Sequence, residues 1–319
     1  MTHLTVDVII PTCRPGSQFE SLMRSLDNQT VRPESILVMN TEKKWWDAAG
    51  VDTSAFLRGR SEKGIPLRLF HLPQEEFDHG GTRDRAAGMC SAEVLLFMTQ
   101  DAVPADQYLI ENLLEALENT GAAAAYARQL PQPDCRYLEA YTRSFNYPEK
   151  SFVKSAKDLP KLGIKTYFCS NVCAAYRRGV YEKLGGFEKH TIFNEDMIFA
   201  AGLIKAGYSI AYAAKARVIH SHNYSGLQQF KRNFDLAVSQ ADHPQIFQDV
   251  PSEGEGIRLV AKSAAYVCRK GRIWLLIPLV WQSGCKYLGY LLGKNYRRLP
   301  AFAIKFCTMN KKYWKNKYF

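Results

Sequence analysis

Several groups of polar residues in this chain have the types and the spacing that chemistry on a phosphorylated substrate needs. The run Pro11–Arg14 follows a short apolar stretch, and Phe77–Arg83 sets two glycines and an arginine at the start of a helix-like segment. Glycines let a backbone approach a ligand closely, and the amides of a helix N-terminus together with an arginine favour phosphate. Phe77–Arg83 is therefore a candidate phosphate-binding segment, with a plain glycine-rich helix entry as the alternative.

Two acidic positions supply candidates for a metal ligand and a general base. Asp101 directly follows the apolar run Val94–Met98, where a carboxylate can ligate a Mg²⁺ or Mn²⁺ ion that bridges a diphosphate; a helix cap is the alternative. Asp196 begins a helix-like segment behind Asn194 and Glu195. Acids at such a position often only complement the helix dipole. A general base requires a carboxylate in a partly desolvated cleft, and Asp196 is the best-placed candidate.

Two histidines, His220 and His222, stand at the end of a strand-like segment. Histidine is a common metal ligand, so either imidazole could complete a metal site with Asp101. Solvated surface histidines are the alternative that this pattern leaves open.

The elements that position these residues alternate along the first 130 residues. Strands are predicted at Val6–Ile10, Ser35–Met39, Leu67–His71, Val94–Met98 and Ala122–Ala127. Between them, the spacing of Phe19, Leu22, Met23 and Leu26 fits one face of a helix, and helices are also predicted at Gly81–Cys90 and Asp106–Leu117. This alternation predicts an α/β fold with a mostly parallel central sheet flanked by helices. Ligands of such sheets bind at the carboxyl ends of the strands.

The second half of the chain begins with an irregular stretch. Leu130–Lys165 is rich in proline, tyrosine and charge without a clear period, which indicates a long excursion that shapes an acceptor site. Regular elements follow, with strands predicted at Tyr167–Tyr176, Tyr208–Ala213 and Arg217–His220, and helices at Arg177–Leu184, Asn194–Ala206 and Gly226–Ser239.

The composition indicates a folded protein that does not bind nucleic acid. Apolar residues make up 46% and charged residues 23%, which is ordinary for a globular chain. The net charge of +11 comes from residues 257–319, which hold 14 Lys/Arg and no Asp/Glu, whereas the first 256 residues hold 28 Lys/Arg against 31 Asp/Glu. A general polyanion-binding surface is therefore not expected on the body of the protein.

The eight cysteines have no CxxC pair, and the N-terminus runs directly into a strand-like segment. This pattern predicts free thiols and a cytoplasmic location.

The basic C-terminal region, predicted as residues 251–319, carries the apolar run Trp274–Trp281 between arginines and lysines. The run is too short to span a bilayer, which needs about 20 residues. Tryptophan, tyrosine and basic residues alternating with leucine are typical of a segment in the interface of an anionic membrane. A helical appendage that packs on the catalytic domain (predicted as 1–250) or on a second subunit of a homodimer is the alternative.

In order and spacing, residues 5 to 240 resemble the family 2 glycosyltransferases of GT-A fold. The family's opening strand with Pro-Thr matches Val6–Arg14, and its metal motif falls on Thr99–Asp101. Its Gly-Gly-Phe stretch and Glu-Asp pair match Gly185–Phe187 and Glu195–Asp196, and its late strand ending in histidine matches Val218–His220.

Within the family, three motifs are similar to bacterial rhamnosyltransferases that use dTDP-L-rhamnose. They are His79–Arg83, Thr99–Asp101 and His220–Ser225. The sequence departs from the family at two acidic positions. The first metal-motif acid is replaced by Thr99, and within Met39–Glu42 the acid that helps hold the nucleoside is replaced by Asn40.

The resemblance implies a single inverting displacement that needs a divalent cation. Asp196 would deprotonate the acceptor hydroxyl, while the metal and Arg83 neutralise the departing diphosphate. The implied metal ligands are Asp101, His220 and His222, and the implied acceptor-binding residues are Asn171 and Glu195, with Trp45 and Trp46 as further candidates for sugar contact. The implied donor-binding residues are Pro11, Thr12, Arg14, Asn40, Asp78, His79, Gly80, Gly81, Arg83, Thr99 and Gln100.

This resemblance predicts a peripheral enzyme at the inner face of the cell membrane. Its expected acceptor is a lipid-linked saccharide, used in the synthesis of bacterial cell-surface polysaccharide. A UDP-sugar donor and a non-catalytic saccharide-binding module remain the alternatives. A nucleotidyltransferase fits poorly, because the glycine-rich basic loop expected after the first strand is missing from Thr12–Gly16.

Overall fold

The computed structural model describes residues 4–51, 64–248, 250 and 253–318, and these form two compact units. Unit 1 comprises Met1–Gln132, Tyr147–Lys189 and Glu195–His220, and unit 2 comprises Pro133–Asn146, His190–Asn194 and Ser221–Phe319. The boundary predicted between a catalytic domain and a C-terminal region, at residues 250 and 251, stays a prediction. Helix α9 (Gly226–Asp242) groups with the C-terminal helices of unit 2.

Among the described residues, nine strands form one sheet in unit 1 with the order β3-β2-β1-β4-β8-β6-β9-β5, and β7 pairs with β9. Strands β3, β2, β1 and β4 are parallel, as are β6 and β9, whereas β8 runs antiparallel to both of its neighbours. The strands are β1 (Val6–Cys13), β2 (Ser35–Thr41), β3 (Leu67–Leu72), β4 (Val94–Met98), β5 (Val103–Pro104), β6 (Ala124–Leu130), β7 (Phe152–Lys154), β8 (Cys173–Arg177) and β9 (Ile210–Ile219).

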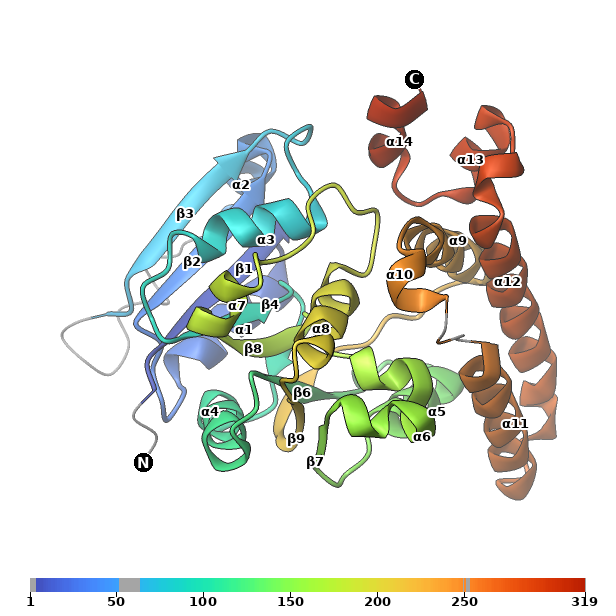
Figure 1. Ribbon diagram of the computed structural model, residues 1–319, viewed down its shortest axis with the longest axis horizontal. Helices are drawn as coiled ribbons and strands as arrows, with labels where there is room; N and C mark the ends of the chain where they lie inside the picture. Colours follow the sequence, from blue (N-terminus) through green and yellow to red (C-terminus); the bar gives the residue numbers. More distant parts are fainter. Residues whose placement is uncertain (1–3, 52–63, 249, 251–252, 319) are drawn as a thin grey trace. The chain divides into compact units, whose positions relative to one another are not determined.

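Helices cover both faces of this sheet. The predicted apolar face of α1 (Ser17–Asp27) is buried in a cluster with alternate residues of β1 and β4 and with α4 (Leu109–Thr120). On the other face, the ring of Phe97 lies within aromatic contact of Tyr181 and Phe187. Figure 1 shows α3 (His79–Ala87), α7 (Arg178–Lys183) and α8 (Glu195–Lys205) on this same face. The predicted α/β sheet with helices on both faces is confirmed.

Two stretches differ from their predicted structure. Residues 130–165, expected to be irregular, contain α5 (Tyr137–Asn146), β7 and α6 (Leu159–Leu162). The two strands predicted on either side of residue 215 are one continuous strand, β9, whose register with β6 shifts between Ala127 and Arg128. Ala214–Ala216 lie at this irregularity, between the partners of Ala127 and Arg128, and a local sequence pattern does not reveal that the strand continues through them.

Unit 2 is helical, and close backbone contact joins two of its helices. A Cβ on Gly289 would lie 2.1 Å from the carbonyl oxygen of Phe230, and one on Gly293 would lie 2.3 Å from that of Phe234. These glycines therefore fix which face of α12 (Leu276–Lys294) meets α9. No helix within the described part of the chain is long and apolar enough to cross a membrane. The remaining helices of the unit are α5, α10 (Pro244–Phe247), α11 (Glu253–Arg269), α13 (Ala301–Cys307) and α14 (Lys311–Tyr318).

Candidate active site

The three residues before β8, Ser170–Val172, connect the predicted base to the predicted metal site. The backbone N–H of Asn171 donates to Asp196 Oδ2 at 3.1 Å. Ser170 Oγ accepts from the side-chain amide of Gln129 at 3.2 Å, and the carbonyl of Val172 accepts from the N–H of Thr99 at 3.1 Å. We call Ser170–Val172 the connecting segment, because its consecutive residues hold groups from β4, β6 and α8.

Asp196 lies in the first turn of α8 and is held by two backbone donors. Besides the N–H of Asn171, the N–H of Met197 donates to Asp196 Oδ1 at 2.7 Å. Burial is the main cause that raises the pKa of Asp196, to about 7, and the charge of Glu195 adds to it. A carboxyl group with a pKa in this range suits proton transfer near neutrality.

The pKa of Glu195, the neighbouring acid, is shifted in the opposite direction. Arg83 Nη1 lies 3.2 Å from Glu195 Oε1, and both side chains are largely buried. Burial alone would raise the pKa of Glu195, but the guanidinium of Arg83, with His79 and other contacts, lowers it. Arg83 therefore keeps Glu195 ionised, and that charge in turn favours the protonated form of Asp196.

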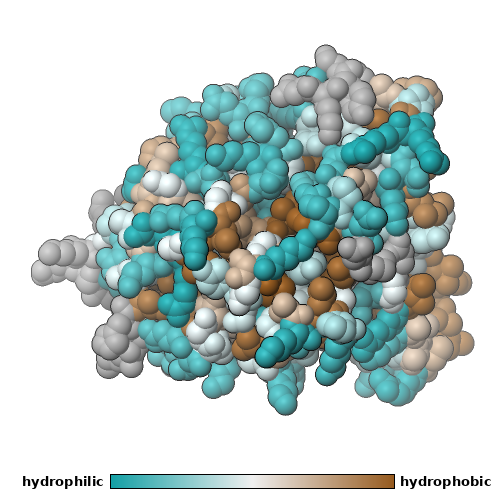
Figure 2. All heavy atoms as spheres, viewed as in Figure 1, coloured by the Kyte–Doolittle hydropathy of each residue, from teal (hydrophilic) through white to brown (hydrophobic). Residues whose placement is uncertain are grey.

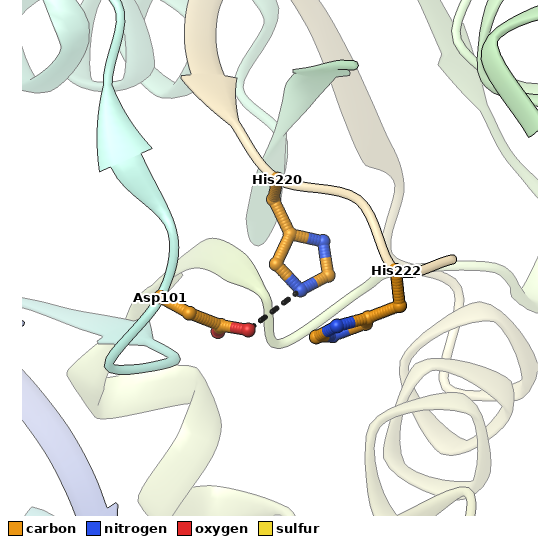
Figure 3. A group of neighbouring side chains, drawn as sticks. All are labelled: Asp101, His220 and His222. Carbon is orange, nitrogen blue, oxygen red and sulfur yellow. Dashed lines mark ion pairs between the residues drawn. The ribbon is translucent and has the colours of Figure 1, made fainter. Parts of the chain in front are cut away.

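Asp101 and His220 approach each other at the ends of β4 and β9, as Figure 3 shows. His220 Nε2 lies 3.5 Å from Asp101 Oδ2. His220 Nδ1 lies 3.1 Å from Gln129 Oε1, and because the Gln129 amide nitrogen donates to Ser170, its oxygen accepts the Nδ1 proton. The other ring nitrogen, Nε2, therefore faces the carboxylate. Such orientation of a histidine by a second residue is typical of metal sites.

The residues present fit a divalent cation. Ligand atoms of Asp101, His220 and His222 lie within 4.8 Å of one another. One carboxylate oxygen and two imidazole nitrogens are a recognised donor set for divalent metals. These three side chains therefore place an oxygen ligand and two nitrogen ligands close enough to share one cation.

Thr99 occupies the position of the acid that the family's metal motif usually has. Its hydroxyl oxygen is buried and makes no hydrogen bond within the described structure. A buried hydroxyl without a partner costs free energy unless a ligand or water satisfies it. Thr99 therefore remains a candidate donor contact beside Asp101.

The other predicted donor residues at the ends of β1 and β2 are engaged with each other. Thr12 Oγ1 donates to Asn40 Oδ1 at 3.1 Å, and the Asn40 amide nitrogen donates to the carbonyl of Glu42 at 3.1 Å. Gln100 exchanges two hydrogen bonds with the backbone of Cys13, at 2.9 and 3.0 Å. These pairs join neighbouring strand ends, and a donor contact for them stays a prediction.

The two tryptophans near this edge are in different environments. The guanidinium of Arg14 lies 4.3 Å from the centre of the Trp45 ring. Trp46 is buried in the core against Phe19, with ring centres 5.6 Å apart, which is the alternative that its sequence position allowed.

The glycine-rich run Asp78–Arg83 has a structural explanation of its own. Asp78 caps α3 by accepting from the N–H of Gly81. A Cβ on Gly80 would lie 1.8 Å from the carbonyl oxygen of Glu188, so glycine is required there for packing. Arg83 also donates to the carbonyl of His79 at 2.8 Å. Phosphate binding by this run stays a prediction. The donor contact predicted for Pro11 of β1 also stays a prediction.

Asn171, predicted as an acceptor contact, has both side-chain groups occupied. Its amide nitrogen donates to Glu195 Oε1 at 3.4 Å, and its oxygen accepts from the hydroxyl of Tyr176 at 2.9 Å. The sequence predictions missed Gln129 and Ser170, because each acts through a residue distant in the chain. The position of Gln129 beside a predicted strand end was the one signal available.

The sheet order, the helices on both faces and the polar residues at the strand ends define a glycosyltransferase of the GT-A fold. The chain belongs to glycosyl transferase family 2, whose profile matches residues 7–185. Over 93% of its length it superposes with 88% of a mannosyltransferase from Pyrobaculum calidifontis, solved with GDP-Man and Mn²⁺, with a TM-score of 0.62 and 14% identity. Residues 1–349 of S. aureus TarS align over 92% of this chain and 91% of that one, with a TM-score of 0.52 and 14% identity.

Two curated relatives match nearly the whole chain. The O-antigen chain rhamnosyltransferase RfbN of Salmonella typhimurium is 39% identical, with 98% of this chain and 97% of the relative covered. The O-antigen chain rhamnosyltransferase WbaN of Salmonella anatum is 36% identical, with 97% and 95% covered.

Proposed function

We propose that this chain transfers L-rhamnose from dTDP-L-rhamnose to a saccharide acceptor, with inversion at the anomeric carbon. The names of both full-length relatives support the sugar, and the His79–Arg83, Thr99–Asp101 and His220–Ser225 motifs support the donor class. The observation that carries the proposal is the connecting segment, because it holds a base of raised pKa and the support of a metal-binding histidine on consecutive residues.

In the proposed reaction, Asp196 accepts the proton of the acceptor hydroxyl. The acceptor oxygen forms a bond to the anomeric carbon as the bond to the diphosphate oxygen breaks, and the diphosphate leaves with that electron pair. Asp196 has the raised pKa that a base near neutrality needs. Arg83 acts through Glu195 rather than on the leaving group, since its guanidinium is paired with that carboxylate.

Asp101, His220 and His222 would hold the divalent cation, which neutralises the charge of the diphosphate when bound. Between the two expected ions, Mn²⁺ fits better than Mg²⁺, because Mg²⁺ strongly prefers oxygen ligands and two of these three groups are imidazoles. The remaining predicted donor contacts, Thr99 among them, would line the same strand ends.

Acceptor-dependent release of the nucleoside diphosphate tests the proposal. The purified chain is incubated with dTDP-L-rhamnose or with UDP-sugars, with and without Mn²⁺, in the presence of a lipid-linked saccharide extract. Release that requires dTDP-L-rhamnose and Mn²⁺ is expected. Release with UDP-sugars alone would overturn the rhamnose assignment, and no release with any donor would favour the non-catalytic saccharide-binding module.

The finer part of the proposal is that unit 2 docks on the anionic inner face of the cytoplasmic membrane. One face of α12 is apolar and exposed, with exposed fractions between 37% and 78%, and Figure 2 shows apolar side chains gathered over this helix. The members of this face, which we call the α12 stripe, are Ile277, Val280, Trp281, Tyr287, Leu288 and Leu291.

The α12 stripe cannot turn inward, because Gly289 and Gly293 on the opposite side are fixed against the α9 backbone. The surrounding residues 257–319 carry 14 Lys/Arg and no Asp/Glu. Charge of one sign opposes the pairing of two copies through this region and favours an anionic lipid surface. A homodimer through the same stripe is the competing outcome.

Flotation tests the docking with vesicles of phosphatidylcholine alone and of phosphatidylcholine mixed with phosphatidylglycerol. The chain should float with the anionic vesicles only, and Ile277→Glu combined with Val280→Glu should abolish flotation. Val153→Glu, which adds a charge at an exposed apolar position of unit 1, is the control. Unchanged flotation of the double variant would contradict the docking, and a dimer-to-monomer change without any effect on vesicles would assign the stripe to a second copy.

A further inference from the structure

Unit 2 contains a cavity of about 300 Å³ that is lined entirely by its own residues. Its wall comes from the start of α5, the loop after β9, the first turns of α9 and the first turns of α12. This volume lies at the small end of the roughly 300–1,000 Å³ range of small-molecule sites, so it suits one ring-sized group. Of the sequence motifs, only His220–Ser225 contributes to its wall, through His222, Asn223 and Tyr224.

Two side-chain amides in this wall have no hydrogen-bond partner within the described structure. Gln229 of α9 is 8% exposed and lines the cavity. Gln282 of α12, partly buried, lines it from the facing helix. A polar group removed from water without a partner costs free energy, so amides that line a cavity are suited to a ligand with hydroxyl groups.

Aromatic side chains in the same wall are held in place by their neighbours. The ring of Tyr137 stacks on Tyr266 with centres 5.6 Å apart, and the guanidinium of Arg272 covers it at 4.2 Å. The ring of Tyr224 lies 5.0 Å from that of His222. Aromatic rings held in place in this way, combined with amides, suit a pyranose, which has apolar faces and a rim of hydroxyl groups.

The loop that carries His222 and Tyr224 is hydrogen-bonded to the segment before α5. The side chain of Asn223 accepts from the N–H of Arg136 at 2.8 Å and donates to the carbonyl of Asp134 at 3.0 Å. The cavity wall is therefore formed before any ligand binds, which lowers the entropy cost of binding.

We propose that this cavity binds a pyranose ring of the saccharide acceptor, an inference that rests on the proposed transfer. His222 both lines the cavity and belongs to the Asp101 and His220 ligand group. A sugar held there would contact His222. The cavity rather than Asn171 or Glu195 then supplies most of the acceptor contacts, since those two side chains are already paired.

Kinetics of Gln229→Leu combined with Gln282→Leu test the site. Leucine keeps the size of each side chain and removes its amide, so KM for the acceptor should rise about tenfold or more. KM for dTDP-L-rhamnose and its slow hydrolysis in the absence of acceptor should not change. Gln248→Leu, at an exposed glutamine of the same unit, is the control. An unchanged acceptor KM would overturn the proposal, and a raised donor KM would assign the cavity to the donor sugar.

A binding measurement that needs no turnover distinguishes failure of the proposed transfer from failure of the cavity proposal. Saturation-transfer NMR with methyl glycosides of common hexoses should show binding to the unmodified chain and to the Gln248→Leu control. The double variant should lose that signal. If no sugar nucleotide is turned over but the binding pattern is as expected, the cavity remains a saccharide site on a non-catalytic module. If no glycoside binds to the unmodified chain, the cavity assignment is wrong whatever the activity.

Discussion

The polar side chains around the connecting segment of unit 1 and those along α9 and α12 of unit 2 differ in whether they are paired. Around Ser170–Val172, side chains are paired with one another over long sequence distances, as in the contacts of Gln129 with His220 and of Arg83 with Glu195. Along α9 and α12, by contrast, Gln229 and Gln282 have no partner within the described structure, and the α12 stripe is exposed. The first region is organised for chemistry in advance, whereas the second offers groups whose partners lie outside the chain.

The largest effect is expected from removing the proposed base, Asp196. Asp196→Asn keeps the size of the side chain and one oxygen acceptor, but it cannot accept the acceptor proton. We expect kcat to fall by about 10²–10⁴-fold while donor affinity stays nearly intact. Steady-state kinetics and donor titration measure the two quantities. Asp47→Asn, at an exposed carboxylate of α2 (Lys43–Ala49), is the matched control, and retained turnover in Asp196→Asn would end the base assignment.

A smaller effect is expected from loosening His220, a proposed metal ligand, without substituting any proposed ligand. Gln129→Leu removes the acceptor of the His220 Nδ1 proton. Loss of such an orienting partner typically costs about 10–100-fold in metal affinity. Activity should therefore recover at high Mn²⁺ concentration, which loss of a ligand in Asp101→Ala would not allow. An unchanged Mn²⁺ dependence in Gln129→Leu would show that Gln129 does not orient the site.

In unit 2, two glycines of the same helix should respond in opposite directions. A Cβ on Gly289 would lie 2.1 Å from the Phe230 carbonyl, whereas one on Gly284 would meet nothing within 4 Å. Gly289→Ala should destabilise the protein by about 1–3 kcal/mol through overpacking. Gly284→Ala should instead stabilise it by up to about 1 kcal/mol through helix propensity. Chemical denaturation measures both, and equal effects would contradict the close packing of α9 and α12.

The raised pKa of Asp196 has a consequence for stability that is smaller still. The folded protein holds the proton of Asp196 more tightly than the unfolded chain does. The contribution of this proton to the free energy of unfolding is therefore complete below pH 3.8 and is lost as pH rises to about 7. Asp196→Asn should therefore melt at a higher temperature than the unmodified chain near pH 7. The difference should shrink toward pH 3.8. A difference that is independent of pH would contradict the burial of this carboxylate.

Sequence reasoning recovered most of unit 1 because local patterns decide its elements. Short apolar runs predicted β1, β2, β3 and β4, and the four apolar residues of α1 are buried together as expected. The reading of Tyr167–Tyr176 as one strand was too long, since β8 begins only at Cys173. The irregular residues before it form the connecting segment, whose partners come from other strands.

The candidate site was predicted in part for the same reason. Asp101, His220 and His222 follow strand ends, and the structure brings their ligand atoms together. Gln129 and Ser170 were missed, because their roles depend on pairing across the sheet rather than on local pattern. The cavity of unit 2 was also missed, since its wall joins α5, α9 and α12 from distant parts of the sequence.

The most direct test of the central claim is calorimetric titration of dTDP-L-rhamnose into three proteins, the unmodified chain, Asp101→Ala and Asp196→Asn, with and without Mn²⁺. We expect Mn²⁺-dependent binding of similar affinity to the unmodified chain and to Asp196→Asn, and loss of that binding in Asp101→Ala. An affinity for dTDP-L-rhamnose that is the same without Mn²⁺ and in Asp101→Ala would contradict the account. So would the absence of binding to any of the three proteins.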